Sequence, residues 1–180
     1  PAVVLVHGFP DLALGWHNQL PVLAEAGFHA IAPDMRGYGG SSCPHPVDAY
    51  SIDELSGDLV ALLDALEIEK AVFVGHDWGG FVVWGMAALH PERVAGVVAA
   101  CTPYIPFPSV AVHTDVVEGD IERQYVAWFQ IPDVPETVMN PNAEMIVDKM
   151  MRSSVPMEEA YAAAFADGKL NAVGYVILHF

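Results

Sequence analysis

The sequence predicts an α/β fold, in which helices flank a parallel β-sheet. Short apolar runs alternate with amphipathic segments along the N-terminal half of the chain, and this alternation is typical of strand–helix–strand units. Apolar residues make up 53% of the chain, as a sheet covered on both faces requires. The expected elements, alternately strand and helix, are Ala2–Val6, Gly15–Ala26, His29–Pro33, Ser51–Leu66, Ala71–Val74, Gly79–Leu89 and Val94–Ala100.

The helix after Ser51 has the clearest local signals. Ser51-Ile52-Asp53-Glu54 has the S-x-x-E form of a capping box, in which the two side chains satisfy backbone N–H groups of the first turn. The leucines that follow fall at helical spacing and give this helix one apolar face: Leu55, Leu59, Leu62, Leu63 and Leu66.

The most informative segment joins the third strand to its helix, and it reads Val74-Gly75-His76-Asp77-Trp78-Gly79-Gly80. Glycines on both sides of Asp77 allow strand and helix to approach closely around a sharp, strained turn. Hydrolases usually place a serine at the centre of such a nucleophile elbow. An Asx-turn or a helix N-cap is the structural alternative for Asp77, because aspartate is common just before helices.

An aspartate in this position predicts a carboxylate nucleophile. It is ionised at neutral pH and needs no base for its attack. Such a group can displace a strained epoxide oxygen or a halide from saturated carbon, and the product is an alkyl-enzyme ester on Asp77. Water activated by a histidine would then attack the ester carbonyl, while backbone N–H groups hold the oxyanion.

The first strand runs into a glycine turn, Val3-Val4-Leu5-Val6-His7-Gly8-Phe9-Pro10. In an elbow fold, the loop after this strand and the residue after the nucleophile each supply one oxyanion N–H. The backbones of Phe9 and Trp78 are therefore the candidates. A second glycine-rich loop follows Ala30–Pro33, but it lacks the G-x-G-x-x-G spacing of a dinucleotide site.

Three motifs together resemble a known family: H-G-F-P from His7, A-P-D-M-R-G-Y-G-G-S-S from Ala32, and G-H-D-W-G-G from Gly75. In this order and spacing they resemble the epoxide hydrolases of the α/β-hydrolase superfamily. The resemblance implies an α/β-hydrolase fold, a partial parallel sheet with flanking helices, followed by part of a helical lid. It places the core at residues 1–103, and the linker and lid at residues 104–180.

The lid segment is expected to be helical at Glu118–Gln130, Asn142–Ser153 and Pro156–Ala166. The resemblance implies two lid tyrosines that protonate the opening epoxide oxygen, and Tyr125 and Tyr175 are the candidates. Packing on the core is the structural alternative for both. The resemblance and the aromatic character of Trp78, Trp128 and Phe129 indicate a site that binds a small hydrophobic epoxide, with water as the second substrate.

The length of the chain limits how many of the expected catalytic residues it can contain. A complete α/β hydrolase with a lid has roughly 280–320 residues, so we expect the 180 residues to be a fragment. The family's catalytic histidine and its acidic partner match nothing in the sequence, and the chain alone is expected to be inactive. Two alternatives stay open: a haloalkane dehalogenase with the same aspartate nucleophile, and an inactive or binding-only module.

Charge and composition exclude other classes. The net charge is −16 with seven Lys and Arg residues, so nucleic acids and anionic membranes are poor partners. The apolar runs are too short to span a bilayer. We expect no cofactor and no metal, because no Cys/His cluster in the sequence has metal spacing and Cys43 and Cys101 are isolated from any such pattern. The low cysteine content suits a cytoplasmic protein; oligomeric state is left open.

Overall fold

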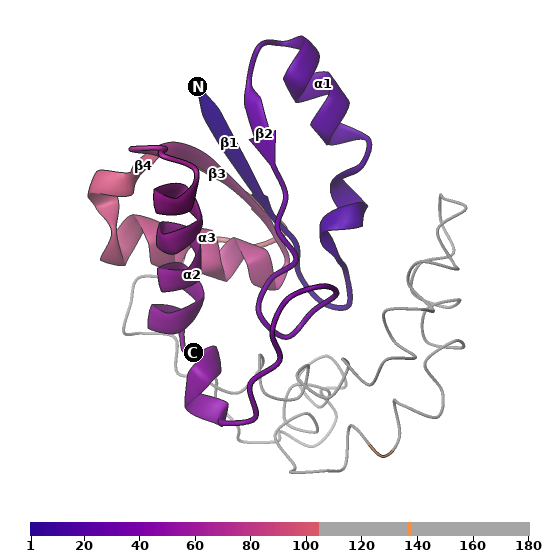
Figure 1. Cartoon of the computed structure of the whole chain (residues 1–180), viewed down its shortest axis with the longest axis vertical. Coiled ribbons are helices and arrows are strands. Elements are labelled where there is room, and N and C mark those ends of the chain that lie inside the picture. Colours follow the sequence, from indigo (N-terminus) through magenta and orange to yellow (C-terminus); the bar gives the residue numbers. More distant parts are fainter. Residues whose placement is uncertain (105–136, 138–180) are drawn as a thin grey trace. The chain divides into compact units, whose positions relative to one another are not determined.

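The computed structural model describes residues 1–104 and Thr137 (Figure 1). Contacts group Pro1–Arg36 with Ser51–Val110 in one compact unit and place Gly37–Tyr50 in another, where Val47–Tyr50 forms the short 3-10 helix η2. The elements of the first unit are β1 (Ala2–Val6), η1 (Ala13–Trp16), α1 (Gln19–Glu25), β2 (His29–Ile31), α2 (Ile52–Ala65), β3 (Ala71–His76), α3 (Trp78–Leu89), η3 (Pro91–Arg93) and β4 (Val94–Ala100). The expected alternation of strands and helices is therefore confirmed. The helices predicted for the lid segment fall on residues outside the described part of the chain.

The strands form one parallel sheet in the order β2-β1-β3-β4. All the residues of β1 are buried, as expected for an inner strand of a parallel sheet. Val6 at the end of β1 pairs with Gly75 near the end of β3. The loops that follow these two strands therefore emerge at the same edge of the sheet, where ligand sites of parallel sheets lie.

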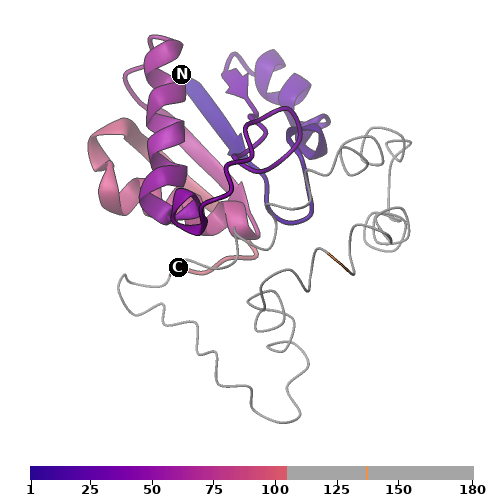
Figure 2. The same cartoon turned by 60° about the horizontal axis from the view of Figure 1, so that its bottom comes forward.

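The helices pack around this sheet in two groups. The helix α3 contacts β3 and β4, α2 packs against α3, and α1 contacts β2. Both views show α1 apart from the α2–α3 pair (Figures 1 and 2). On α2, the apolar face is buried at Leu55, Leu59 and Leu63, whereas Leu66 is the C-cap residue and 41% exposed. The predicted face is thus confirmed at Leu55, Leu59 and Leu63, whereas Leu62 is only partly buried and Leu66 is exposed.

The capping box of α2 forms only in part. The Ser51 hydroxyl accepts a hydrogen bond from the Glu54 N–H at 3.4 Å. The Glu54 carboxylate instead pairs with Arg36 at 3.1 Å, and Arg36 also makes a forked pair with Asp58 at 2.7 and 2.6 Å. These hydrogen-bonded carboxylates raise the pKa of the Arg36 guanidinium and tie the loop after β2 to α2.

The first helical segment differs from the prediction. Instead of one helix over Gly15–Ala26, the chain forms η1 and then the shorter α1. Pro21 explains the break, because proline has no N–H and its ring clashes with the preceding turn of a helix. It is tolerated only near a helix start, and α1 begins two residues before it, at Gln19.

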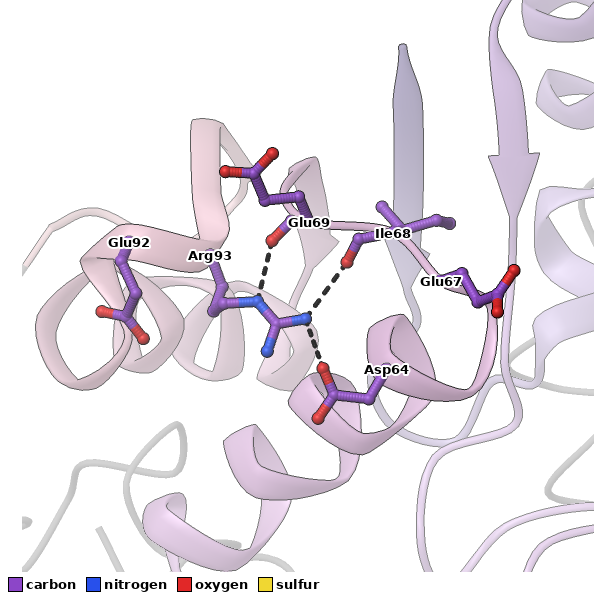
Figure 3. A pocket seen from close by; sticks show the side chains of 6 residues that line it. All are labelled: Asp64, Glu67, Ile68, Glu69, Glu92 and Arg93. Carbon is purple, nitrogen blue, oxygen red and sulfur yellow. Dashed lines mark hydrogen bonds and ion pairs between the residues drawn. The ribbon is translucent and has the colours of Figure 1, made fainter.

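Arg93 lies directly before β4, and its side chain binds the connection between α2 and β3 (Figure 3). Its guanidinium donates to the carbonyl oxygens of Glu69 and Ile68 at 2.8 and 3.1 Å, and it pairs with Asp64 at 2.7 Å. An open pocket of about 500 Å³ surrounds these groups. Because Glu69 precedes β3 and Arg93 precedes β4, this pocket lies at the opposite end of the strands from the elbow. Arg93 therefore fixes the α2–β3 connection rather than taking part in the candidate site.

Candidate active site

Asp77 occupies the predicted elbow between β3 and α3. Its backbone has φ 56° and ψ −124°, a left-handed conformation that is costly for any residue except glycine. Three hydrogen bonds hold it there. The Asp77 N–H donates to the Ala100 carbonyl at 3.2 Å, and the Asp77 carbonyl accepts from the Gly80 N–H at 2.9 Å and from the Thr102 hydroxyl at 2.6 Å. The surrounding structure thus stabilises a strained turn that presents this side chain.

The Asp77 carboxylate does not cap the helix that follows it. Asp77 stands at the N-cap position of α3, but its side chain makes no capping hydrogen bond. Its Oδ1 atom instead accepts a hydrogen bond from the Phe9 N–H at 3.0 Å. The other oxygen, Oδ2, has no hydrogen-bond partner within residues 1–104 and Thr137. The geometry therefore argues against the N-cap alternative.

Glycines make the close approach around Asp77 possible. A Cβ atom on Gly8 would lie 2.6 Å from both Cβ and Oδ1 of Asp77, and one on Gly75 would overlap the Gly79 carbonyl. A Cβ atom on Gly79 would in turn overlap the carbonyl oxygens of Val6 and His7. The β1 loop, β3 and the start of α3 are thus packed backbone against backbone.

The two residues expected to supply oxyanion N–H groups reach Asp77 from different elements: Phe9 lies in the loop after β1, and Trp78 follows Asp77. Phe9 already contacts Asp77 Oδ1 through its N–H. Trp78 is the first residue of α3, and the N–H groups of a first helical turn point toward the amino-terminal end of the axis. The Trp78 ring is 9% exposed and packs at 5.3 Å, centroid to centroid, against Phe81.

His7 is the first residue of the loop after β1 and is buried, with 2% of its surface exposed. Its Nε2 atom accepts a hydrogen bond from the Met35 N–H at 3.0 Å, so this nitrogen carries no proton. The proton of the neutral ring is then on Nδ1, which lies 3.0 Å from the Gly8 carbonyl oxygen and donates to it. Burial lowers the pKa of His7 from its ordinary value of 6.5, although the Gly8 hydrogen bond and the charges of Asp11 and Asp34 act in the opposite direction.

This lowered pKa makes stability depend on pH. As the pH falls below about 6.5, His7 gains a proton in the unfolded chain while it stays neutral in the folded one. The unfolded state then binds more protons, so the free energy of unfolding should decrease until the folded His7 also protonates. We expect the melting temperature of the full-length protein to fall more between about pH 7.5 and about pH 5.5 than that of its His7→Asn variant. Equal slopes would show that His7 does not contribute.

Thr102 contacts the elbow, although sequence reasoning gave it no place in the site. Its hydroxyl donates to the Asp77 carbonyl, and its own carbonyl accepts from Trp84 Nε1 at 3.2 Å. The Tyr104 ring packs edge-on against Trp84 at 5.1 Å. The one sequence feature that could have pointed to Thr102 is its position shortly after the predicted strand Val94–Ala100, at the carboxyl end of the sheet. No local pattern shows that it reaches the elbow.

The structure does not describe the remaining predicted site residues. Tyr125, Trp128, Phe129 and Tyr175 lie outside the described residues. Across residues 1–104 and Thr137, no group of three or more His, Cys, Asp or Glu side chains is arranged to hold a metal ion. No helix in this same part of the chain has the length and hydropathy to cross a membrane.

A family model described as the alpha/beta hydrolase fold matches residues 1–173. The chain belongs to the α/β-hydrolase family. This α/β hydrolase is 42% identical over 167 residues to "Epoxide hydrolase A" of Mycobacterium tuberculosis, and the match covers 91% of the chain and 51% of that protein. It is 40% identical over 153 residues to "Bifunctional epoxide hydrolase 2" of Sus scrofa, covering 85% of the chain and 28% of that relative. The chain thus spans about half the length of the first relative and less of the second.

Solved structures agree with the family assignment. The crystal structure of epoxide hydrolase A from Mycobacterium thermoresistibile matches this α/β hydrolase with a TM-score of 0.86 and 32% identity, covering 98% of the chain and 66% of that structure. The predicted fold class and the resemblance to epoxide hydrolases are both confirmed. The elbow described above is therefore part of an α/β-hydrolase core.

Proposed function

We propose that this α/β hydrolase is an epoxide hydrolase that opens an epoxide to a vicinal diol through an ester on Asp77. The observation that carries the proposal is the Asp77 carboxylate itself. It stands at a nucleophile elbow, with Oδ1 on the Phe9 N–H at 3.0 Å. This hydrogen bond orients the carboxylate so that Oδ2 is the attacking atom. The names of the relatives support the same reaction class.

The first step forms the ester. Asp77 Oδ2 attacks an epoxide carbon, and the bond from that carbon to the epoxide oxygen breaks. The oxygen leaves as an alkoxide and takes a proton from a tyrosine hydroxyl, for which Tyr125 and Tyr175 are the proposed donors. The carboxylate charge is consumed in the new ester bond.

The second step releases the diol. A histidine, not assigned to any residue of this chain, removes a proton from water as the water attacks the ester carbonyl carbon. Negative charge develops on Oδ1, where the N–H groups of Phe9 and Trp78 would hold it. The bond between the carbonyl carbon and the alkyl oxygen then breaks, and that oxygen takes the remaining proton of the attacking water, which frees the diol and restores the carboxylate. The histidine returns its proton to the tyrosinate left by the first step.

The proposed substrate is a small hydrophobic epoxide. Trp78 directly follows Asp77 in the chain and is largely buried. Trp128 and Phe129 are the proposed contacts from the lid. An apolar pocket would exclude bulk water and strengthen the electrostatic interactions of the ester-forming step.

The test is product analysis on the full-length protein, with styrene oxide and 1-chlorobutane as probes. We expect diol from the epoxide and no chloride from the haloalkane. In a single turnover in ¹⁸O-water, the label should appear in the Asp77 carboxylate and not in the diol, because the diol takes its new oxygen from Asp77. Chloride release without diol would indicate a dehalogenase, and no turnover of either probe would indicate a binding-only module.

A further inference from the structure

A series of hydrogen bonds leads from the loop after β2 to the nucleophile, and it passes through His7. The Met35 N–H donates to His7 Nε2, and His7 Nδ1 donates to the Gly8 carbonyl oxygen, each at 3.0 Å. The Phe9 N–H donates to Asp77 Oδ1, also at 3.0 Å. The Gly8 carbonyl and the Phe9 N–H are the two ends of one peptide group. The buried imidazole therefore binds the same peptide whose other end contacts the nucleophile.

We propose that His7 is a positioning residue for the oxyanion donor: its Nδ1–H holds the Gly8–Phe9 peptide so that the peptide N–H points at Asp77 Oδ1. A hydrogen bond to the carbonyl end also polarises the peptide and strengthens its N–H as a donor. The Asp11 N–H donates to the same carbonyl at 3.0 Å and supports this orientation. The inference rests on the proposed function, because an oxyanion forms at Oδ1 only if Asp77 carries an ester.

The two chemical steps depend on this N–H to different extents. During ester formation the carboxylate loses charge, so a hydrogen bond to Oδ1 orients the group without stabilising the transition state. During ester hydrolysis charge develops on Oδ1, and a well-aimed N–H then contributes most. A misplaced Phe9 N–H should therefore slow hydrolysis more than ester formation, and the ester should accumulate.

Two variants separate the two hydrogen bonds of the imidazole. In His7→Asn the side-chain amide N–H can take the place of Nδ1–H and still donate to the Gly8 carbonyl, but nothing accepts from Met35. In His7→Gln the amide oxygen can take the place of Nε2 and accept from Met35, but the donor to the Gly8 carbonyl is lost. His7→Asn leaves the buried Met35 N–H without a partner, whereas in His7→Gln the buried side-chain NH2 lacks one and the Gly8 carbonyl keeps the Asp11 N–H. Each variant therefore leaves one buried donor group unpaired, and we expect both to be less stable than the wild type.

The experiment measures both variants and the wild type as full-length proteins, in single turnovers with styrene oxide. Quenched-flow and mass spectrometry give the rates at which the Asp77 ester forms and disappears. We expect His7→Gln to hydrolyse the ester about tenfold more slowly than His7→Asn, with ester formation changed less and with kcat and KM both lowered. A selective loss of ester hydrolysis in His7→Gln, larger than any difference in melting temperature between the two variants accounts for, is a result that a purely structural role of His7 does not produce.

The outcomes distinguish this inference from the proposed function. If the wild type forms diol through the ester but the two variants hydrolyse it at equal rates, the positioning role is wrong. The same holds if both steps slow in proportion to the loss of stability. If the wild type forms no ester on Asp77, the proposed function itself is wrong, and the inference falls with it.

Discussion

Asp77→Ala is expected to abolish diol formation by the full-length protein, with a loss in kcat/KM of about 10⁴- to 10⁶-fold. The reason is that no other described carboxylate is placed as Asp77 is. It combines the elbow backbone, at φ 56°, with an Oδ1 atom on the Phe9 N–H. Alanine keeps the turn but has no oxygen to attack the epoxide. The measurement is steady-state diol production, together with mass spectrometry of the trapped ester.

Two further variants make this result specific. Asp77→Asn keeps the size and shape of the side chain and removes its charge, so freshly prepared protein should be similarly inactive. Asp53→Asn makes the same chemical change at an exposed position in the first turn of α2, and its activity should equal that of the wild type. Substantial ester formation in Asp77→Ala would show that another residue is the nucleophile.

The second large effect is expected on stability, from Gly79→Ala. Gly79 lies in the first turn of α3, and its added Cβ would overlap the Val6 carbonyl and come within 2.6 Å of the His7 carbonyl oxygen. Both obstacles are backbone atoms of β1 and its loop, which cannot rotate away. We expect the free energy of unfolding to drop by about 3 kcal/mol. Chemical denaturation of the full-length protein measures this change.

Two other helical glycines provide matched controls for the same substitution. A Cβ on Gly85 would meet only the Ile52 side chain, at 2.5 Å, and that side chain can shift, so Gly85→Ala should cost about 1 kcal/mol. A Cβ on Gly57 would meet nothing within 4 Å. Gly57→Ala should therefore stabilise α2 by about 0.5–1 kcal/mol, because alanine is the better helix former. Equal effects at all three positions would contradict the packing described around Gly79.

Most of the secondary structure could be predicted because it depends on local patterns. The strand at Val94–Ala100 is found with the predicted bounds, and α2 begins directly after its predicted cap, Ser51. The errors also have local physical causes. Pro21 shortens α1, and β3 continues to His76, two residues beyond the apolar run, because its pairing with β4 extends to His76 and Ala100. Tyr125 and Tyr175 stay predictions.

The sequence by itself determined the strand–elbow–helix segment around Asp77 and the glycine loop that meets it. Glycines around Asp77 indicate the elbow, and the order of strands and helices indicates a parallel sheet whose loops converge at one edge. Only the tertiary structure decided which atoms touch. Phe9 and Asp77 are 68 residues apart, and Asp77 and Thr102 are 25 apart. Such contacts depend on strand order and register, which bring residues together that are distant in the sequence. Residue spacing along the chain predicts only which side chains are neighbours within one helix or strand.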